Sequence, residues 1–246
     1  MTPIDVTSPV IITIDGPAGA GKSTVGRAVA ERLGLGYLDT GAMYRAVTFA
    51  ALRRGIAVND EHAVAELATV LQLDVVDRTV VVDGVDATGE IRGRDVTEGV
   101  SAIAANTQVR EELRARQRQW AADRGGGVIE GRDIGTIVFP EATLKLFVTA
   151  NPRVRAERRV SEIGGLLDDV EASITERDRR DMHRADGPLR AADGAVTIDT
   201  TGLTITEVVE RIIELLPAPH DPAPHDPAPH DPPLHDAPPH DEGVTS

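Results

Sequence analysis

The chain has 246 residues, of which 41% are hydrophobic and 27% are charged, and its formal net charge is −14. It contains no cysteine, which excludes disulfides, thiolate metal clusters and a thiol nucleophile. We find neither a signal-peptide pattern nor an apolar run of roughly eighteen residues, so we expect a soluble cytoplasmic protein with no membrane span. The acidic charge and an aromatic content of only 2% also argue against nucleic-acid binding.

The first predicted elements surround a glycine-rich turn. We expect residues 1–8 to be a disordered lead, followed by a β-branched strand over Val10–Ile14. That run meets Asp15-Gly16-Pro17, which is typical of a buried strand entering a tight turn. Helical spacing then runs from Ser23 to Leu33, and Gly34 is a typical helix stop.

The next stretch predicts an insertion of antiparallel strands. A short strand at Tyr37-Leu38 precedes a helix from about Ala42 to Arg54, and a shorter helix follows from His62 to Leu71. Two valine-rich runs come next, at Leu73–Val76 and Thr79–Val82. The short gap between them, Asp77-Arg78, indicates a β-hairpin, and Asp83-Gly84 indicates a further turn.

The second half returns to alternating strands and helices. We expect a long charged helix over Val100–Asp123, broken by three glycines, and a polar, Arg-rich helical segment over residues 153–184. The remaining elements are strands and one helix, predicted at Val128–Ile129, Leu144–Val148, Val196–Ile198 and Thr206–Leu216. The alternation predicts an α/β fold, in which a mostly parallel sheet has helices on both faces.

The C-terminal segment has a composition of its own. From Pro217 the unit Ala-Pro-His-Asp-Pro recurs every five residues, with histidines at His220, His225, His230, His235 and His240. Dense proline prevents helix and sheet, so we expect residues 217–246 to be a disordered, solvated spacer. Regular histidines could bind a transition metal, but a flexible chain does not preorganise such a site.

Residues 16–24 fit the P-loop pattern G-x-x-x-x-G-K-[ST] between a strand and a helix. In this motif backbone N–H groups and the helix N-terminus surround phosphate oxygens. Lys22, one of only two lysines in the chain, would reach the β- and γ-phosphates, and Ser23 would contact Mg²⁺. The motif therefore predicts a nucleoside triphosphate site, which we expect to be the ATP site, at Gly16, Pro17, Ala18, Gly19, Ala20, Gly21, Lys22, Ser23 and Thr24.

Three further polar segments should meet at the carboxyl edge of the sheet, where open α/β folds bind ligands. They are residues 38–45, Glu130–Asp133, and a helical face with Arg177, Asp181 and Arg184. Each segment alone is also compatible with surface charge or a self-contained ion pair. Together they supply the arginines and carboxylates that a second phosphorylated ligand needs.

These blocks resemble the bacterial cytidylate (CMP) kinase family over residues 9–216. The resemblance rests on Ile14–Thr24, Leu38–Arg45, Gly131–Pro140, the stretch from Glu176 to Pro188, and Asp199–Thr201. It implies a P-loop core, a nucleoside-monophosphate-binding insertion near residues 59–100 and a mobile lid over about residues 155–184. It also implies MgATP as phosphoryl donor and CMP or dCMP as acceptor. We expect a monomer, because no long apolar stripe is unaccounted for.

The family's residue roles can be carried over to matching positions. By this resemblance Lys22, Arg132, Arg177 and Arg184 are catalytic, and Arg177 and Arg184 bridge the phosphates of the two nucleotides. Asp181 would bind the ribose hydroxyls. The acceptor's phosphate and sugar would be surrounded by Thr40, Tyr44, Arg45 and Arg132, and the cytosine edge would be read by Ser101, Arg110 and Asp133. The family often has serine at the position of Thr40, which keeps the hydroxyl.

Other functions share the P-loop. A kinase of a small metabolite such as shikimate or gluconate needs no base-reading residues, and a related nucleotide kinase would accept UMP or AMP. An ATP-dependent switch would bind ATP without phosphorylating a monophosphate. The Arg-rich segment argues against the switch, because a switch has no need to neutralise two phosphate groups at once.

Overall fold

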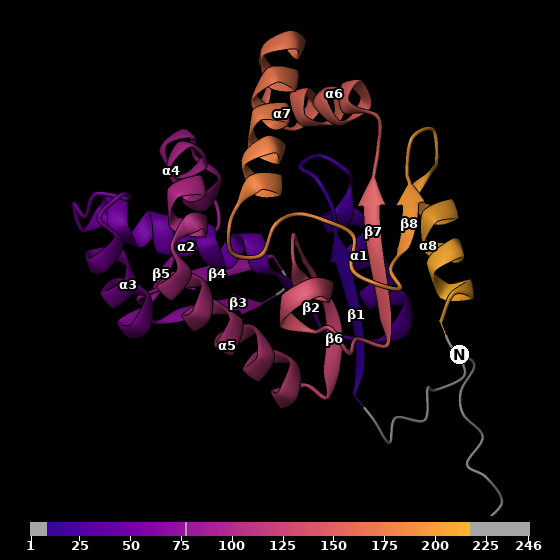
Figure 1. Ribbon diagram of the computed structural model, residues 1–246, viewed down its shortest axis with the longest axis horizontal. Helices are drawn as coiled ribbons and strands as arrows, with labels where there is room; N and C mark the ends of the chain where they lie inside the picture. The colour runs from indigo at the N-terminus through magenta and orange to yellow at the C-terminus, as the bar shows by residue number, and fades with distance from the viewer. Residues whose placement is uncertain (1–8, 77, 217–246) are drawn as a thin grey trace, which may run out of the picture.

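The computed structural model describes residues 9–76 and 78–216, so the expected lead and the Pro-His-Asp repeats lie outside the described residues. Five parallel strands form the main sheet in the order β2-β6-β1-β7-β8 (Figure 1). Parallel pairing brings their carboxyl ends to one edge. The strands are β1 (Val10–Asp15), β2 (Tyr37–Asp39), β6 (Gly126–Gly131), β7 (Leu144–Thr149) and β8 (Val196–Asp199).

Helices cover both faces of this sheet, as the alternation predicts. One apolar layer joins β1 and β7 to α1 (Lys22–Leu33) and α8 (Ile205–Glu214). The other joins β6 to α2 (Thr40–Arg53) and α5 (Thr107–Asp123). Neighbouring residues of β6 serve opposite layers, since Val128 belongs to the first and Ile129 to the second. The predicted fold class is thereby confirmed.

The predicted antiparallel strands form a separate three-stranded sheet, β3-β4-β5. Its strands are β3 (Leu73–Val76), β4 (Thr79–Val82) and β5 (Val85–Asp86), and they follow α3 (Glu61–Val70). Val75, Val80 and Val82 are buried in the same apolar layer as α2 and α3. A 3₁₀ turn, η1 (Glu90–Arg92), leads from this sheet back to the helices.

The predicted helix over Val100–Asp123 is wrong, because the chain forms two helices there. Helix α4 spans Arg94–Ala105, and α5 begins at Thr107. Asn106 between them has extended backbone angles, and its side chain accepts the Val109 N–H as the N-cap of α5. Its amide also donates to the Glu61 carbonyl at 2.8 Å, so a contact with α3 fixes the break.

The predicted start of the next strand at Val128 is also wrong, since β6 begins at Gly126. Pairing with β1 explains the difference, because Val10 lies opposite Gly126 and the two strands start together. After β6 a π-helical turn, η2 (Ile134–Val138), replaces regular structure.

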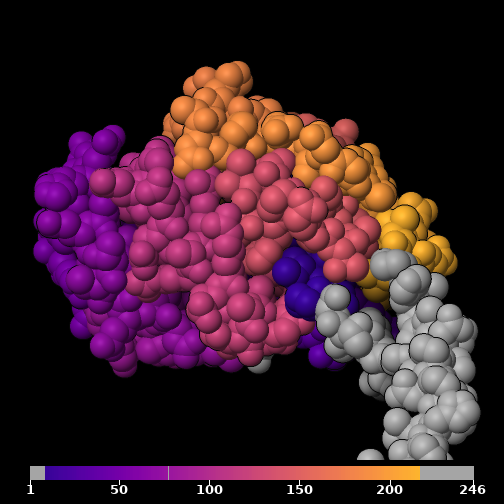
Figure 2. Space-filling view, turned by 60° about the horizontal axis from the view of Figure 1, so that its bottom comes forward, coloured from indigo at the N-terminus to yellow at the C-terminus, as the bar shows by residue number. Residues whose placement is uncertain are grey.

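The Arg-rich segment forms two helices, α6 (Pro152–Ile163) and α7 (Leu167–His183), called here the α6–α7 pair. Gly164 and Gly165 make the turn between them. The pair stands at the carboxyl edge of the main sheet, and the chain that leaves α7 runs across the molecule to β8 and α8 (Figure 1 and Figure 2). In the described part of the chain, no helix is both long and apolar enough to span a membrane.

Candidate active site

The glycine-rich loop, residues 16–21, connects β1 to α1 at the carboxyl edge of the sheet. Helix α1 begins at Lys22, and it has no side-chain N-cap and no acidic residue in its first turn. Its first backbone N–H groups are therefore available to an anion. Gly16 lies so close to β7 that an added Cβ would be 1.9 Å from the Val148 carbonyl oxygen.

Side chains of the α6–α7 pair form hydrogen bonds to the backbone of this loop. Asp178 on α7 accepts the Ala18 N–H at 3.0 Å, and Arg155 on α6 donates to the Ala18 carbonyl at 2.9 Å. Arg155 and Asp178 are themselves paired at 2.5 Å and are both buried. Thr200, just after β8, donates to the Ala20 carbonyl at 3.1 Å. The loop is thus fixed by three elements distant in sequence.

Lys22 and Ser23 lie against a buried carboxyl group at the end of β6. The Ser23 hydroxyl donates to Glu130 Oε1 at 2.6 Å, and Lys22 Nζ donates to the Pro17 carbonyl at 2.9 Å. Burial raises the pKa of Glu130, and burial together with the charge of Arg132 lowers the pKa of Lys22. A bound polyphosphate would favour the charged form of Lys22.

Ser23 and Glu130 provide the kind of oxygen atoms that Mg²⁺ prefers as ligands. Glu130 Oε2 is buried and has no hydrogen-bond partner among the described residues, while Oε1 of the same carboxylate accepts from the Ser23 hydroxyl. One hydroxyl and one carboxylate suit a hard cation that takes its other ligands from phosphate and water. In residues 9–76 and 78–216, no group of three or more acidic or histidine side chains forms a metal site by itself.

Asp15 joins the glycine-rich loop to the segment after β6. Its carboxylate, which is 2% exposed, accepts the N–H groups of Ile134 and Gly135 at 2.9 and 2.8 Å. Burial raises the pKa of Asp15 from 3.8 to about 6, against the lowering effect of those two hydrogen bonds. Asp15 therefore fixes the π-helical turn that carries Asp133 at its start.

Arg45, Arg132 and Arg177, the arginine cluster, converge near Lys22 from α2, the end of β6 and α7. Arg45 donates to the Ile91 carbonyl and Thr97 Oγ1 at 3.2 and 3.0 Å, and Arg132 pairs with Asp181 at 2.9 Å. Arg177 forms no hydrogen bond or ion pair within the described residues. Burial, together with the charges of neighbouring arginines, lowers the pKa of both Arg45 and Arg177 to about 10. The cluster therefore holds an excess of positive charge.

A second group, the α5 ion-pair cluster, contains Arg110, Arg114, Asp133 and Asp186. Arg110 is 1% exposed and donates to Asp133 at 2.5 Å and to Asp186 at 3.2 Å. Arg114, one helical turn further along α5, lies 2.5 Å from Asp186 and 3.4 Å from Asp133. The Arg110 guanidinium carbon lies 5.9 Å from the centre of the Tyr44 ring, which places the aromatic ring beside the cluster.

The structure brings most of the predicted acceptor residues together, with three differences, at Arg184, Thr40 and Ser101. Arg184 does not share the helical face of Arg177 and Asp181, because α7 ends at His183 and Arg184 has an extended backbone. Its guanidinium instead donates to the carbonyls of Asp186 and Gly187 and lies 3.7 Å from Asp133. The Thr40 hydroxyl, which was expected beside the acceptor's phosphate and sugar, donates to the Glu130 backbone carbonyl at 2.7 Å.

Ser101 is the predicted base-reading residue that the structure does not connect to the others. It lies partly buried on α4, and no hydrogen bond joins it to any described residue of the α5 ion-pair cluster. The remaining predicted residues, including Tyr44 and Asp181, lie within the two clusters or directly beside them.

Sequence reasoning missed five polar residues that hold the site: Asp15, Arg114, Arg155, Asp178 and Asp186. Asp15 could have been found from its place at the end of a buried strand, directly before the glycine-rich loop. Arg114 could have been found from its spacing of four residues after Arg110 on one helical face. Asp186 gave no signal, because it lies in irregular chain and meets α5 across more than seventy residues.

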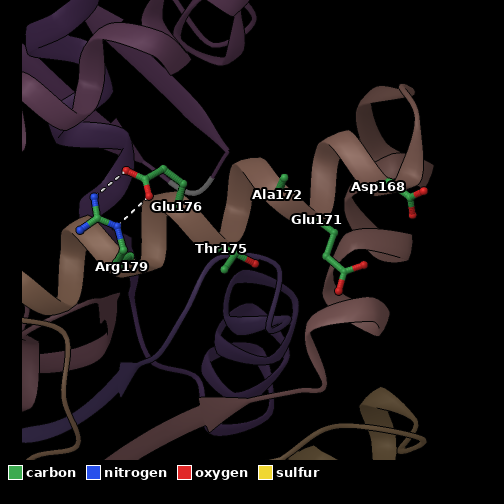
Figure 3. A pocket seen from close by; sticks show the side chains of 6 residues that line it. All are labelled: Asp168, Glu171, Ala172, Thr175, Glu176 and Arg179. Atoms are coloured by element: carbon green, nitrogen blue, oxygen red, sulfur yellow. Dashed lines mark hydrogen bonds and ion pairs between the residues drawn. The ribbon is translucent and has the colours of Figure 1, made fainter.

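A hollow of about 500 Å³ lies on the opposite, outer face of α7 (Figure 3). It is lined by Asp168, Glu171, Ala172, Thr175, Glu176 and Arg179, and Glu176 is paired with Arg179 there at 2.7 Å. Arg153 pairs with Asp168 and Glu171, and Arg180 also pairs with Glu176, so the arginines around this hollow already have carboxylate partners. On the inner face of α7, Asp178 contacts the glycine-rich loop and Arg177 belongs to the arginine cluster.

Comparison with known proteins agrees with this geometry. The family model described as cytidylate kinase matches residues 12–218. A cytidylate kinase of Streptomyces griseus is 46% identical over 215 residues, which covers 85% of this chain and 93% of that protein. A bifunctional pantoate ligase/cytidylate kinase of Synechocystis sp. is 51% identical over 217 residues, and the match covers 83% of this chain but 42% of that longer protein.

Among solved structures, an uncharacterized protein from Eubacterium ventriosum superposes with a TM-score of 0.50. The match covers 84% of this chain and 97% of that one at 13% identity, and so supports the fold alone. The family model spans residues 12–218, which include the glycine-rich loop and both clusters, and the Streptomyces relative matches 85% of the chain. The chain therefore belongs to the cytidylate kinase family of nucleoside monophosphate kinases.

Proposed function

We propose that the protein transfers the γ-phosphoryl group of MgATP to CMP and dCMP. The observation that carries this proposal is that Arg45 and Arg177, beside Lys22, form no ion pair with any carboxylate of the described residues. Guanidinium groups held together without carboxylate partners are costly unless an anion joins them. A monophosphate placed there would meet the terminal phosphate of ATP held on the glycine-rich loop.

The donor side follows from the start of α1. The uncapped N–H groups and Lys22 would hold the β- and γ-phosphates of ATP. Ser23 and Glu130 would hold Mg²⁺, which when bound neutralises charge on the phosphates. Arg155 and Asp178 hold the Ala18 backbone in place, and so preserve the curvature of the glycine-rich loop.

The α5 ion-pair cluster suits a cytosine base. Cytosine presents a ring nitrogen and a carbonyl as acceptors beside an exocyclic amine as donor, and uracil reverses part of this pattern. Arg110 offers N–H donors and Asp133 offers carboxylate lone pairs side by side, 2.5 Å apart. We assign base reading to this pair with Ser101, and the ribose hydroxyls to Asp181 beside Arg132.

The chemistry needs positioning and charge neutralisation more than a base. The acceptor phosphate is already an oxyanion at neutral pH, so no side chain has to remove a proton. Arg132, Arg177 and Arg184 would hold the two phosphate groups in line and balance the charge that moves during transfer. The α6–α7 pair acts as the lid, which excludes water that would otherwise take the phosphoryl group.

The test is a coupled assay of ADP release from MgATP with CMP, dCMP, UMP, AMP and shikimate, with ATP binding measured in parallel. We expect the highest kcat/KM with CMP and dCMP. Highest activity with another acceptor would move the protein to a different kinase class. ATP binding without turnover of any monophosphate would support the switch and contradict the proposal.

A further inference from the structure

The loop that leaves α7, residues 184–187, is tied to α5 by one carboxylate. Asp186 Oδ1 accepts from Arg114 at 2.5 Å, and its Oδ2 accepts from Arg110 Nε at 3.2 Å. Burial acts to raise the pKa of Asp186, but the hydrogen bond from Arg114 and the two arginine charges outweigh it and hold the pKa below its usual value. Asp186 is therefore an anion shared by the buried guanidinium of Arg110 and the partly buried guanidinium of Arg114.

Three separate elements orient Arg110. Its Nη2 donates to Asp133, its Nη1 to the Ala104 carbonyl at 3.2 Å, and its Nε to Asp186. A guanidinium has five N–H donors, so two are left that no described residue takes. Asp186 is the partner that fixes the Nε edge, and together with Asp133 and the Ala104 carbonyl it sets the direction of the two remaining donors.

Asp186 also limits competition for Asp133. Arg114 already lies 3.4 Å from Asp133 Oδ2, but its shorter contact, at 2.5 Å, is with Asp186. Without Asp186, the charge of Arg114 would be drawn fully to Asp133. That would occupy the carboxylate oxygen to which we assign the amine of the base.

The same loop is fixed by an arginine at the end of the lid. Arg184 donates to the carbonyls of Asp186 and Gly187, and Gly187 lies directly against the Arg110–Asp133 pair. An added Cβ at Gly187 would be 2.2 Å from Asp133 Oδ2 and 2.3 Å from Arg110 Nη2. The loop therefore continues from the lid helix to the proposed base-reading pair with no intervening space.

We propose that Asp186 is a positioning residue for base recognition, which orients Arg110, keeps Arg114 away from Asp133, and links the end of the lid helix to nucleobase selectivity. This inference rests on the proposed function, since it concerns the selectivity of the same acceptor site. Asp186 itself touches neither the base nor the reacting phosphates in this account.

The test is Asp186→Asn, which keeps the shape of the side chain and removes its charge. The matched control is Asp193→Asn, the same change at an exposed position in the same connecting segment. In Asp186→Asn we expect the KM for CMP to rise on the order of tenfold and the preference for CMP over UMP to fall. The KM for ATP and the kcat should stay within about twofold, and the control should match the wild type.

A second variant distinguishes a positioning role of Asp186 from a purely structural one. Adding Arg114→Gln to Asp186→Asn removes the competitor for Asp133, so the double variant should recover a KM for CMP within about threefold of wild type. A merely structural brace predicts further loss instead. If Asp186→Asn does not fold, Asp186→Glu keeps the charge but displaces the carboxylate, and the same rise in KM is expected.

Wild-type KM and selectivity in folded Asp186→Asn, or an equal rise in the KM for ATP, would overturn the inference while leaving the proposed function intact. Wild-type protein that prefers a different monophosphate would refute the proposed function instead. The comparison of variants is then made with that monophosphate, and an unchanged KM would refute the role of Asp186 as well.

Discussion

The two halves of the site are built in different ways. The glycine-rich loop is one continuous stretch whose backbone faces the proposed phosphates. Side chains from elsewhere, such as Asp178, hold it in place through its backbone at Ala18. The arginine cluster and the α5 ion-pair cluster consist of side chains from α2, α5, the end of β6 and the end of α7. Changes to the first half should therefore act through shape, and changes to the second through charge and pairing.

Arg177→Ala should give the largest effect and the clearest contrast. We expect kcat to fall by about 10³-fold, because an arginine that balances charge in phosphoryl transfer contributes on that scale. The unliganded variant should also be no less stable than wild type, since burial and neighbouring arginines already lower the pKa of Arg177 to about 10. Steady-state kinetics and thermal unfolding check both parts. Unchanged turnover would remove Arg177 from the transition state.

Two glycine substitutions test whether the halves are separable. Gly16→Ala places a Cβ 1.9 Å from a backbone carbonyl, and should raise the KM for ATP by at least roughly tenfold in whatever fraction still folds. Gly187→Ala forces apart the Arg110–Asp133 pair, and should raise the KM for CMP by a similar factor while sparing ATP. Both KM values are measured for each variant. A rise of both constants together in either variant would show that the halves act as one unit.

Asp15→Asn tests the connection between the halves through pH. Because the folded protein raises the Asp15 pKa from 3.8 to about 6, it binds this proton more tightly than the unfolded chain does. Stability from this group is therefore lost as the pH rises through that window, by about 3 kcal/mol in all. Urea unfolding at several pH values from 4 to 7 should show wild type losing stability relative to Asp15→Asn. A difference independent of pH would contradict the assignment.

Glu176→Gln should have the smallest effect. The side chain is 41% exposed on the outer face of α7, and among the described residues it pairs with Arg179 and Arg180, so solvent screens these contacts (Figure 3). Unfolding temperature, kcat and both KM values should match wild type. A clear loss of activity would mean that the outer face of the α6–α7 pair takes part in function.

The difference between the halves also explains what the sequence could predict. The glycine-rich loop, the parallel sheet and the β3–β4 hairpin depend on short, continuous patterns, and all three were predicted. The break between α4 and α5 at Asn106 could not be predicted, because it depends on a contact with Glu61 that exists only after α3 and α5 pack. No local sequence pattern predicts that Asp186 contacts Arg114, seventy-two residues away, or that Arg184 lies beyond the end of α7.

The most direct test of the account is kcat/KM for CMP and UMP in wild type and Asp133→Asn, with the KM for ATP measured alongside. Base reading by the Arg110–Asp133 pair predicts that wild type prefers CMP, that the variant loses this preference by on the order of tenfold or more, and that the KM for ATP does not change. Preserved discrimination in the variant would contradict base reading by the Arg110–Asp133 pair. A rise in the KM for ATP would contradict the separation of the two halves.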